Sequence, residues 1–325
     1  MNAIKILVAD KLAREGLEYL KAAGLAYDER VGLKEAKLAS AVPEYDALII
    51  RGGANVTAKV LERPGKLRAI ARAGVGVDNI DVDAATGRGI LVLNTAGLSA
   101  LLTAEHALAL LMSLARRIPQ ADHSLRQGRL EWQNRIIFQG IQLANKTLGV
   151  VGLGQIGQAV ARRGLAMEMT VIGWDPYFSA PTALDGRVRL FPDFDEFLGH
   201  LDMITFHLPR TGQTRHLLSR ERLFNQCRSN LLVVNVANSE LIDEGALADA
   251  LKAGKIAGAA LDVYAIEPPP RDHPLFDIEN AILTPHVGAL AGEAATAVHA
   301  CKAIAAFLQT GEIRDAVNAV DLPAN

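Results

Sequence analysis

Three glycines near the middle of the chain have the spacing of a turn that binds a dinucleotide. Gly152, Gly154 and Gly157 form a Gly-x-Gly-x-x-Gly motif directly after the apolar run 147–151. The first glycine permits a tight turn, the second lets the backbone approach a pyrophosphate, and the third allows close contact between helix and strand. The free N–H groups at the start of the following helix then stabilise the phosphate charge. Glycine-rich turns are common, so the motif needs support from its surroundings.

A carboxylate at the end of the next apolar run supplies that support. The run 170–174 is followed by Asp175, 18 residues after Gly157. A carboxylate at this place accepts hydrogen bonds from a ribose diol and repels a 2′-phosphate. No Lys or Arg occurs between Asp175 and Arg187. The alternative is a solvated aspartate at a strand end. The combination predicts an NAD site and favours NAD over NADP.

Short β-branched runs alternate with helical patterns along the chain, and these elements must position the site. The predicted strands are residues 4–9, 47–50, 67–71, 90–93, 147–151, 170–173, 203–206, 231–235, 257–261 and 281–283. Near-continuous apolar strands are buried on both faces, which is typical of parallel sheets with right-handed crossovers. We therefore expect an α/β fold with doubly wound parallel sheets, whose ligands bind at the carboxyl ends of the strands.

Two lobes are expected, because two such sheets do not share one core. A helical pattern from Leu101 to about Arg116 follows the turn-rich segment 95–99 and bridges the lobes. A second pattern, from Gly292 to Leu308, returns the chain to the first lobe. The crevice between the lobes is then the default ligand site. Trp132 and Arg135, in a polar loop after the bridging helix, are interpreted as structural or interface residues.

The composition excludes several classes of protein. Half of the 325 residues are hydrophobic, and 34 Lys and Arg oppose 36 Asp and Glu, for a net charge of −2. This balance indicates a folded globular protein and argues against a nucleic-acid partner. Two cysteines, Cys227 and Cys301, suit a reducing compartment. The N-terminal run 1–10 is too short for a signal peptide, and the longest apolar stretch, Ala107 to Ala115, is too short for a membrane span. A cytoplasmic protein without a membrane partner is expected.

Further motifs occur in an order that points to one family. They are Arg72–Asp81, Thr103–Ala107, His207–Pro209 with Thr214 and Arg215, Val234–Ala237, Leu261–Val263, Glu267–Pro268 and Thr284–Gly288. With these motifs the chain resembles the D-isomer-specific 2-hydroxyacid dehydrogenases, most of all the phosphoglycerate dehydrogenases, from residue 4 to about 318. The resemblance implies a Rossmann NAD-binding domain at 99–289 and a flavodoxin-like substrate (lid) domain formed by 1–98 and 290–325. It also implies a homodimer and a small-molecule substrate, without the regulatory extensions that some phosphoglycerate dehydrogenases carry.

The resemblance also assigns roles to residues. His286 is the general acid/base, since imidazole both takes and gives a proton near neutral pH. Glu267 is its partner, because a carboxylate on one ring nitrogen fixes the tautomer and favours the charged ring. Asp262 is assigned to the nicotinamide carboxamide. The predicted cofactor-binding residues are Gly152, Gly154, Gln155, Ile156, Gly157, Asp175, Leu208, Pro209, Val236, Ala237, Asp262, His286, Gly288 and Thr103. No metal site is predicted.

The chain departs from the family at the carboxylate clamp. Where the family has an arginine that grips the substrate carboxylate bidentately, this chain has Asn238, followed by Ser239 in place of the usual glycine. Asparagine donates a hydrogen bond but brings no charge. Ser99 is a second departure, at a position where many relatives have an asparagine near the substrate. Together the departures predict a remodelled pocket, and we therefore treat Asn238 as a member of the catalytic set.

Three interpretations of this pocket remain open. The first is that a carboxylate still binds, held by the N–H groups of Val75 and Gly76 with Arg51 or Arg72, although both arginines follow strands and equally suit a surface role. The second is that the substrate is less charged and that Asn238 bonds a neutral oxygen. The third is that hydride chemistry on hydroxy acids is lost, which leaves a protein that binds the nucleotide, like the corepressors that share this fold, or an enzyme that uses NAD for other chemistry.

Overall fold

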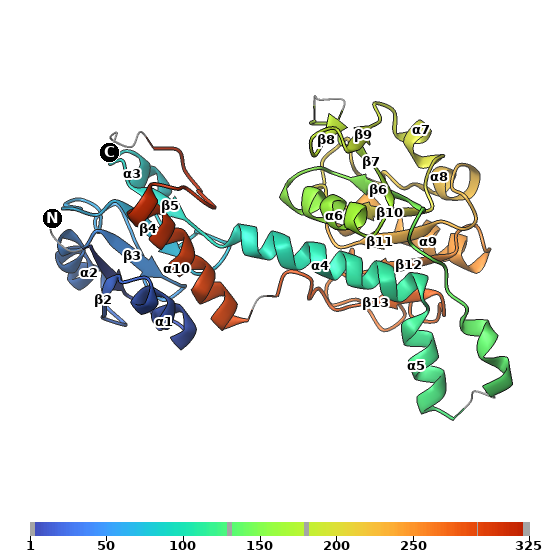
Figure 1. Cartoon of the computed structure of the whole chain (residues 1–325), viewed down its shortest axis with the longest axis horizontal. Helices are drawn as coiled ribbons and strands as arrows, with labels where there is room; N and C mark the ends of the chain where they lie inside the picture. Colours follow the sequence, from blue (N-terminus) through green and yellow to red (C-terminus); the bar gives the residue numbers. More distant parts are fainter. Residues whose placement is uncertain (1–3, 129–131, 179–181, 291, 321–325) are drawn as a thin grey trace. The chain divides into compact units, whose positions relative to one another are not determined.

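The computed structural model describes residues 4–128, 132–178, 182–290 and 292–320. The first three residues of the N-terminal run therefore lie outside the described residues. The chain divides into two compact units, Met1–Ser99 with Leu290–Asn325 (unit 1), and Ala100–Ala289 (unit 2) (Figure 1).

Unit 1 is built on a five-stranded parallel sheet. The strands are β1 (Lys5–Val8), β2 (Ala26–Glu29), β3 (Ala47–Ile50), β4 (Ala69–Arg72) and β5 (Leu91–Leu93), in the order β2-β1-β3-β4-β5. Alternate residues of each central strand face opposite cores, because side chains alternate along a strand. Ile6 and Val8 therefore lie in one core, whereas Leu7 lies in the other.

Helices cover both faces of this sheet. On one face lie α1 (Arg14–Ala22) and α10 (Glu293–Thr310), and on the other lie α2 (Glu35–Ala41), the 3-10 turn η1 (Val42–Glu44) and α3 (Val82–Thr86). α1 and α10 approach closely at a glycine, because a Cβ on Gly16 would lie 2.9 Å from the Ala297 Cβ. The C-terminal tail then joins the sheet edge, where Val317 N–H donates to the Val92 carbonyl at 2.8 Å.

Unit 2 is built on an eight-stranded sheet. The strands are β6 (Thr147–Val151), β7 (Thr170–Trp174), β8 (Thr182–Ala183), β9 (Val188–Leu190), β10 (Met203–Phe206), β11 (Leu232–Asn235), β12 (Gly258–Leu261) and β13 (Ala281–Leu283). Their order is β13-β12-β11-β10-β6-β7-β9-β8, and every described pair is parallel except β8 with β9. The prediction of two doubly wound parallel sheets is confirmed, with this antiparallel edge pair as an addition.

The helices of unit 2 also lie on both faces of their sheet. One core contains residues of α4 (Ala96–Ala115) and α6 (Gln155–Ala166). The opposite core contains residues of α7 (Phe194–Leu198), α8 (Arg220–Asn225), the turn η3 (Ser239–Leu241) and α9 (Glu244–Lys252). Two further helical segments, α5 (Ile118–Arg126) and η2 (Trp132–Phe138), follow α4 and contribute no buried residue (Figure 1).

The helix expected at Leu101 begins five residues earlier, so the prediction of a turn at 95–99 was wrong. The Ala96 N–H donates to the Asn94 side chain at 3.0 Å, and the Gly97 N–H donates to Asp315 Oδ1 at 3.1 Å. These acceptors satisfy N–H groups that a helix otherwise leaves unpaired in its first turn. A capping residue from the C-terminal tail therefore extends the helix backwards.

The same helix corrects the expectation about apolar length. Among the helices of the described residues, α4 alone is long and apolar enough to cross a membrane, whereas the sequence pattern pointed only to Ala107–Ala115. Half of its most apolar window is buried inside the protein. That burial is typical of the core helix of a globular protein.

The segment that carries Trp132 and Arg135 was also described wrongly as a polar loop. It forms η2, and Trp132, Ile136 and Ile137 expose more than half of their surface. The Arg135 guanidinium lies 5.4 Å from the centre of the Trp132 ring. The segment η2 therefore exposes three large apolar side chains beside the polar residues 133–135.

Candidate functional site

The carboxyl edge of the unit 2 sheet brings together most of the predicted cofactor residues. β6 and β10 are neighbours, and the helices that follow them, α6 and α8, contribute to opposite cores. This reversal is the switch point where open α/β sheets bind ligands. Predicted residues follow β6, β7, β10, β11, β12 and β13. Thr103 is buried on α4, one turn before His106, whose Nε2 lies 3.1 Å from the Thr284 hydroxyl.

The three glycines occupy distinct environments, as the motif requires. Gly152 has a φ of 92°, and a Cβ there would lie 2.9 Å from the carbonyl carbon of His207. A Cβ on Gly157 would overlap the Gly152 carbonyl oxygen. By contrast, a Cβ on Gly154 would have no atom within 4 Å. The backbone at Gly154 thus borders open space, which fits the approach of a pyrophosphate.

Two further features suit the adenosine half of a dinucleotide. No side chain caps the N-terminus of α6, so its first N–H groups, from Gln155 onward, remain available to phosphate. The Asp175 carboxylate accepts the Leu153 N–H at 2.7 Å and the Tyr177 N–H at 2.8 Å, one on each oxygen. Each oxygen keeps lone-pair capacity for a ribose hydroxyl, and the two backbone bonds hold the carboxylate in place.

His207 forms part of the wall behind the glycine turn. Burial lowers the pKa of its imidazole to about 3, so the ring is neutral at working pH. Its Nε2 lies 3.0 Å from the Thr205 hydroxyl, and its Nδ1 is buried with no partner among the described residues. The motif His207–Pro209 thus supplies a buried, uncharged residue beside Gly152, with Leu208 and Pro209 following at the strand end.

His286 and Glu267 come together at the ends of β13 and β12. His286 Nδ1 lies 2.8 Å from Glu267 Oε2. The His286 bond is the largest cause of a pKa for Glu267 below its usual range, so the carboxylate is ionised near neutral pH. The imidazole is 56% exposed, which leaves it accessible to a substrate. An exposed imidazole held by a carboxylate is an arrangement suited to proton transfer.

The turn that carries His286 is held by Asp262. The Asp262 carboxylate accepts the Val287 N–H at 3.0 Å and the Gly288 N–H at 2.8 Å. It also accepts the Thr284 hydroxyl at 2.5 Å, and the His106 Nε2 lies 3.3 Å from it. The resemblance pointed to Asp262 as a carboxamide partner, and the sequence analysis missed both its role in this turn and the contribution of His106.

Asn238 caps a short helical turn. Its Oδ1 accepts the Glu240 N–H at 3.1 Å at the start of η3, and its carbonyl accepts the Asn235 side-chain amide at 2.8 Å. The Glu240 carboxylate forms an ion pair with Arg210. The cap uses one lone pair of the side-chain oxygen, so Asn238 offers a ligand its NH2 group and the second lone pair of Oδ1, but no charge. Val236 and Ala237 precede it at the end of β11.

Unit 1 holds the predicted anion-binding residues around its own sheet edge. Asp10, Lys11, Arg51 and Arg72 line a pocket of about 610 Å³. The Asp10 carboxylate accepts the Arg51 N–H at 2.7 Å and fixes the following loop. Arg51 also bonds Glu293 at 2.8 Å, whereas the buried Nε of Arg72 has no partner among the described residues. The pocket is therefore rich in cationic groups.

Val75, Gly76 and Ser99 lie elsewhere in unit 1. Val75 and Gly76 are exposed, and no described residue accepts their N–H groups, although the Val75 carbonyl accepts Asn94 at 2.9 Å. Ser99 lies in the first turn of α4. The N–H groups of Val75 and Gly76 thus remain available to a ligand.

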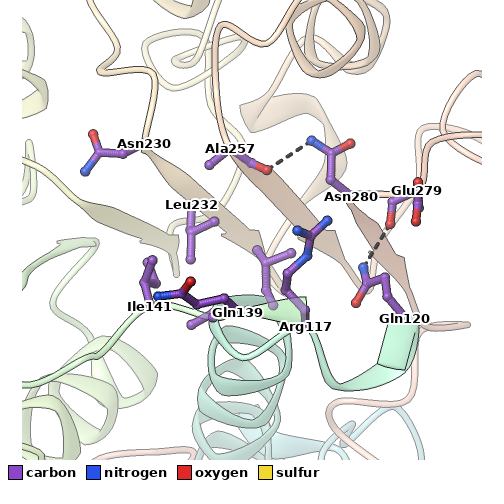
Figure 2. Close-up of a pocket in the computed structure, with 12 residues that line it drawn as sticks. Arg117, Gln120, Gln139, Ile141, Asn230, Leu232, Ala257, Glu279 and Asn280 are labelled. Carbon is purple, nitrogen blue, oxygen red and sulfur yellow. Dashed lines mark hydrogen bonds between the residues drawn. The ribbon is translucent and has the colours of Figure 1, made fainter. Parts of the chain in front are cut away.

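A second pocket of unit 2 lies at the opposite edge of its sheet. It measures about 410 Å³ and borders the amino ends of β11, β12 and β13 (Figure 2). Its polar wall includes Arg117 and Gln120, and the Gln120 amide donates to the Glu279 carbonyl at 2.8 Å. None of the predicted site residues lines it. Within the described ranges, no group of three or more His, Cys, Asp or Glu side chains is arranged to hold a metal ion.

Comparison with known proteins identifies the central part of the chain. The family model described as D-isomer specific 2-hydroxyacid dehydrogenase, NAD binding domain, matches residues 108–288. These residues therefore form an NAD-binding domain, and the prediction of NAD as cofactor is confirmed.

Individual relatives extend the match over both units. D-3-phosphoglycerate dehydrogenase of Archaeoglobus fulgidus is 44% identical over 291 residues, covering 90% of this chain and 54% of that protein. The enzyme of the same name from Rattus norvegicus is 42% identical over 293 residues, with the same coverage. The chain spans about half the length of these curated relatives. A solved structure described as a novel D-lactate dehydrogenase from Sporolactobacillus sp matches with a TM-score of 0.72 and 26% identity, covering 98% of this chain and 100% of that one.

Proposed function

Because the chain belongs to the D-isomer specific 2-hydroxyacid dehydrogenase family, we propose that it is an NAD-dependent oxidoreductase. Its substrate is a small 2-hydroxy acid or a related hydroxy or oxo compound. The observation that carries the proposal is the exposed His286–Glu267 pair, 2.8 Å apart, in the same unit and on the same sheet edge as the glycine turn. A nucleotide cradle and a proton-transfer group are the two parts that alcohol oxidation requires.

The residues of unit 2 divide the work of the reaction. NAD, when bound, would supply the hydride acceptor for oxidation of an alcohol, and NADH the hydride donor for the reverse reaction. The Gly154 backbone, the start of α6 and Asp175 bind the adenosine and pyrophosphate half, and Asp262 retains lone-pair capacity for a carboxamide. We assign to the same binding site Ile156, at the start of α6, and the residues that follow β10 and β11, namely Leu208, Pro209, Val236 and Ala237.

His286 moves the proton. With its Nδ1–H donated to Glu267, the neutral ring presents the lone pair of Nε2 to the substrate hydroxyl and accepts that proton during oxidation. The ionised Glu267 carboxylate balances the positive charge that the ring acquires. In the reverse direction, the charged ring donates the same proton to the oxygen of the carbonyl group.

The substrate clamp is the unusual part of the proposal. The Asn238 amide supplies one neutral donor, so we assign anion binding to groups of unit 1. Arg51 and Arg72 lie in its cationic pocket, and the N–H groups of Val75 and Gly76 have no acceptor among the described residues. Ser99 is proposed as a further substrate contact. A less charged substrate bonded by Asn238 is the variant of this proposal that the loss of charge favours.

A substrate panel tests the function. NADH oxidation at 340 nm would be followed with glyoxylate, hydroxypyruvate, 3-phosphohydroxypyruvate and uncharged aldehydes and ketones. We expect turnover of at least one class, and a loss of about 10²- to 10⁴-fold in His286→Ala with NADH binding retained. Tight NADH binding without turnover of any carbonyl would instead support a nucleotide-binding protein without dehydrogenase activity, the alternative that the missing charge at Asn238 favours.

We further propose a homodimer formed through α5 and η2. Ile118, Leu125, Trp132, Ile136 and Ile137 are each more than half exposed on these two segments (Figure 1). Such a concentration of apolar surface is unusual for a free monomer and suits a second copy of the chain. Sedimentation equilibrium should give twice the chain mass, and Ile136→Lys with Trp132→Lys should give the mass of one chain.

A reducing compartment such as the cytoplasm suits both cysteines. Cys227 and Cys301 are unpaired, and burial raises the pKa of each thiol to about 12. Protonated, buried thiols are inert packing groups rather than nucleophiles.

A further inference from the structure

We propose that Tyr264 is a positioning residue for proton transfer, because it holds both members of the His286–Glu267 pair. Its backbone N–H donates to Glu267 Oε1 at 3.1 Å, and its hydroxyl donates to the Thr284 carbonyl at 2.9 Å. That same carbonyl accepts the His286 N–H at 3.0 Å. One residue therefore bonds directly to the carboxylate and to the turn that carries the imidazole. The proposal rests on the proposed function of the pair.

The His286 turn requires such support. His286 has a φ of 52°, in the left-handed region that non-glycine residues rarely adopt. A strained conformation of this kind persists only where the surroundings hold it. Both side chains of the pair are substantially exposed, at 56% for His286 and 39% for Glu267, so core packing does not fix them. Hydrogen bonds to the backbone around His286 and to the Glu267 carboxylate must therefore fix the geometry of the pair.

The supports lie on both sides of His286. Asp262 accepts the N–H groups of Val287 and Gly288 after it, and Tyr264 bonds the Thr284 carbonyl before it. Of these two supporting residues, Tyr264 is the one that also bonds Glu267. Removal of its hydroxyl therefore frees the leading side of the turn while leaving the trailing side and the nucleotide cradle in place.

Tyr264 is itself rigidly held. Its side chain is buried, and its ring meets the His273 ring edge-on with centres 5.5 Å apart. Glu244 bonds the neighbouring Ala265 N–H at 2.8 Å and lies 3.3 Å from His273 Nε2. Burial raises the pKa of the Tyr264 hydroxyl to about 12, so it remains a proton donor throughout the working range. A fixed donor of this kind transmits its position to the turn that it bonds.

Removal of the Tyr264 hydroxyl should act on kcat rather than on cofactor binding. In Tyr264→Phe the backbone bond to Glu267 remains, but the turn that carries His286 loses its leading support. A small displacement of a proton-transfer group lowers the rate of the step strongly, so we expect kcat to fall about tenfold. The KM for NADH should stay within about twofold of wild type, since Gly154 and Asp175 are untouched.

A double-mutant cycle separates positioning from general damage. If Tyr264 acts through the pair, Tyr264→Phe should lower kcat about tenfold in wild type but less than about twofold when Glu267 is already Ala. Equal losses in both backgrounds would overturn the proposal. Tyr45→Phe is the matched control, because Tyr45 is a buried tyrosine whose hydroxyl bonds Asp28 at 2.6 Å in unit 1. It should leave kcat unchanged.

The tautomer of His286 gives a readout that needs no substrate. In protein labelled with ¹⁵N-histidine, the ring shifts of His286, assigned with His286→Gln, should report the Nδ1–H form in wild type. Tyr264→Phe should lower the population of that form, whereas Tyr45→Phe should not. An unchanged population would overturn the positioning role, even if the wild type turns over no carbonyl and the proposed function fails. Urea unfolding followed by tryptophan fluorescence checks that each variant is folded.

Discussion

Asn238→Arg tests the altered clamp most directly. The substitution places a planar, permanently charged fork where the resemblance to the family locates the carboxylate clamp. It also removes the Asn238 Oδ1 that accepts the Glu240 N–H at 3.1 Å, so the turn η3 loses its cap. The two effects act on different observables, namely turnover of anionic substrates and stability of unit 2.

The expected magnitudes follow from these contacts. A charge-assisted pair with a substrate carboxylate is worth about 1.5–3 kcal/mol, which corresponds to a gain of roughly 10- to 150-fold in kcat/KM. Loss of the cap at η3 costs about 1 kcal/mol of stability. Uncharged carbonyl substrates present no carboxylate to the fork, so their kcat/KM should not rise.

Three variants at this position isolate the cause. Asn238→Arg should raise kcat/KM for 2-oxo acids, whereas Asn238→Ala, which loses the same cap, should not. Asn238→Lys supplies charge without a fork and should gain less than arginine. Steady-state NADH oxidation measures activity, and urea unfolding measures stability. If arginine leaves the kcat/KM of every 2-oxo acid unimproved while the wild type turns them over, the idea of a compromised clamp is refuted.

Further predictions concern the glycine turn and two titrating groups. Gly154→Ala should weaken NADH binding at least about tenfold and leave the stability unchanged, whereas Gly157→Ala, whose Cβ would overlap the turn, should cost about 1–3 kcal/mol of stability. Fluorescence titration with NADH measures the first effect, and urea unfolding measures the second. An NADH affinity of Gly154→Ala equal to that of wild type would contradict the nucleotide-binding role of this turn. The pKa of His207 is about 3 in the folded protein and 6.5 in the unfolded chain, so the unfolded chain binds the proton first as the pH falls and the free energy of unfolding decreases below pH 6.5. About 2 kcal/mol should be lost between pH 7 and pH 5. His207→Gln should remove this part of the pH dependence, measured by urea unfolding with tryptophan fluorescence. The pKa of Glu267 is lowered chiefly by its bond to His286, so the ionised pair should stabilise the fold above pH 4.5, the ordinary pKa of a glutamate, and this stabilisation should be lost as the pH falls through the lower pKa of the folded protein. The unfolding midpoints of wild type and Glu267→Gln should therefore converge in acid. A difference that stays constant with pH would contradict the pair.

The central strands were predictable because strands buried on both faces consist of consecutive apolar residues. Ala47–Ile50, Thr147–Val151 and Met203–Phe206 begin and end where the apolar runs do. The edge strand β13 (Ala281–Leu283) is only half-buried, and it was predicted because its three residues are all apolar. By contrast, β2 was missed because it is an edge strand whose residues are mostly half exposed, so Ala26–Glu29 carries no apolar run. Periodicity reports burial, and an edge strand with little burial leaves little signal.

The start of α4 was not predictable, because its cause lies far away in sequence. Asp315, which accepts the Gly97 N–H, is 218 residues distant. The local segment reads as a turn because it contains glycine and serine and follows Thr95. The local residue Asn94 accepts the Ala96 N–H, and the return of the tail to unit 1 supplies the second acceptor, for the Gly97 N–H.

The candidate site divides in the same way. The glycine turn and Asp175 follow from local spacing, since one strand, one turn and one helix determine their positions. The support around His286 does not, because Asp262 and Tyr264 follow β12, His106 lies on α4, and these residues meet the turn after β13 only when the three elements are packed. A tyrosine or histidine in sequence carries no sign of the carbonyl or carboxylate that it will bond.

The two hydrogen bonds that Asn238 accepts bear on which class of substrate the protein binds. Its oxygen caps η3 with one lone pair, so a ligand meets an uncharged amide at this position, with its NH2 group and the second lone pair of Oδ1. Such a group bonds a carbonyl, an alcohol or one oxygen of a carboxylate, and it distinguishes weakly between them. Discrimination in favour of an acidic substrate must therefore come from Arg51, Arg72 or the N–H groups of 75–76, all in unit 1. If Arg51→Ala and Arg72→Ala together leave the preference between acidic and neutral carbonyl compounds unchanged, the two arginines do not recognise the anion, and any preference for acids rests on the N–H groups of 75–76.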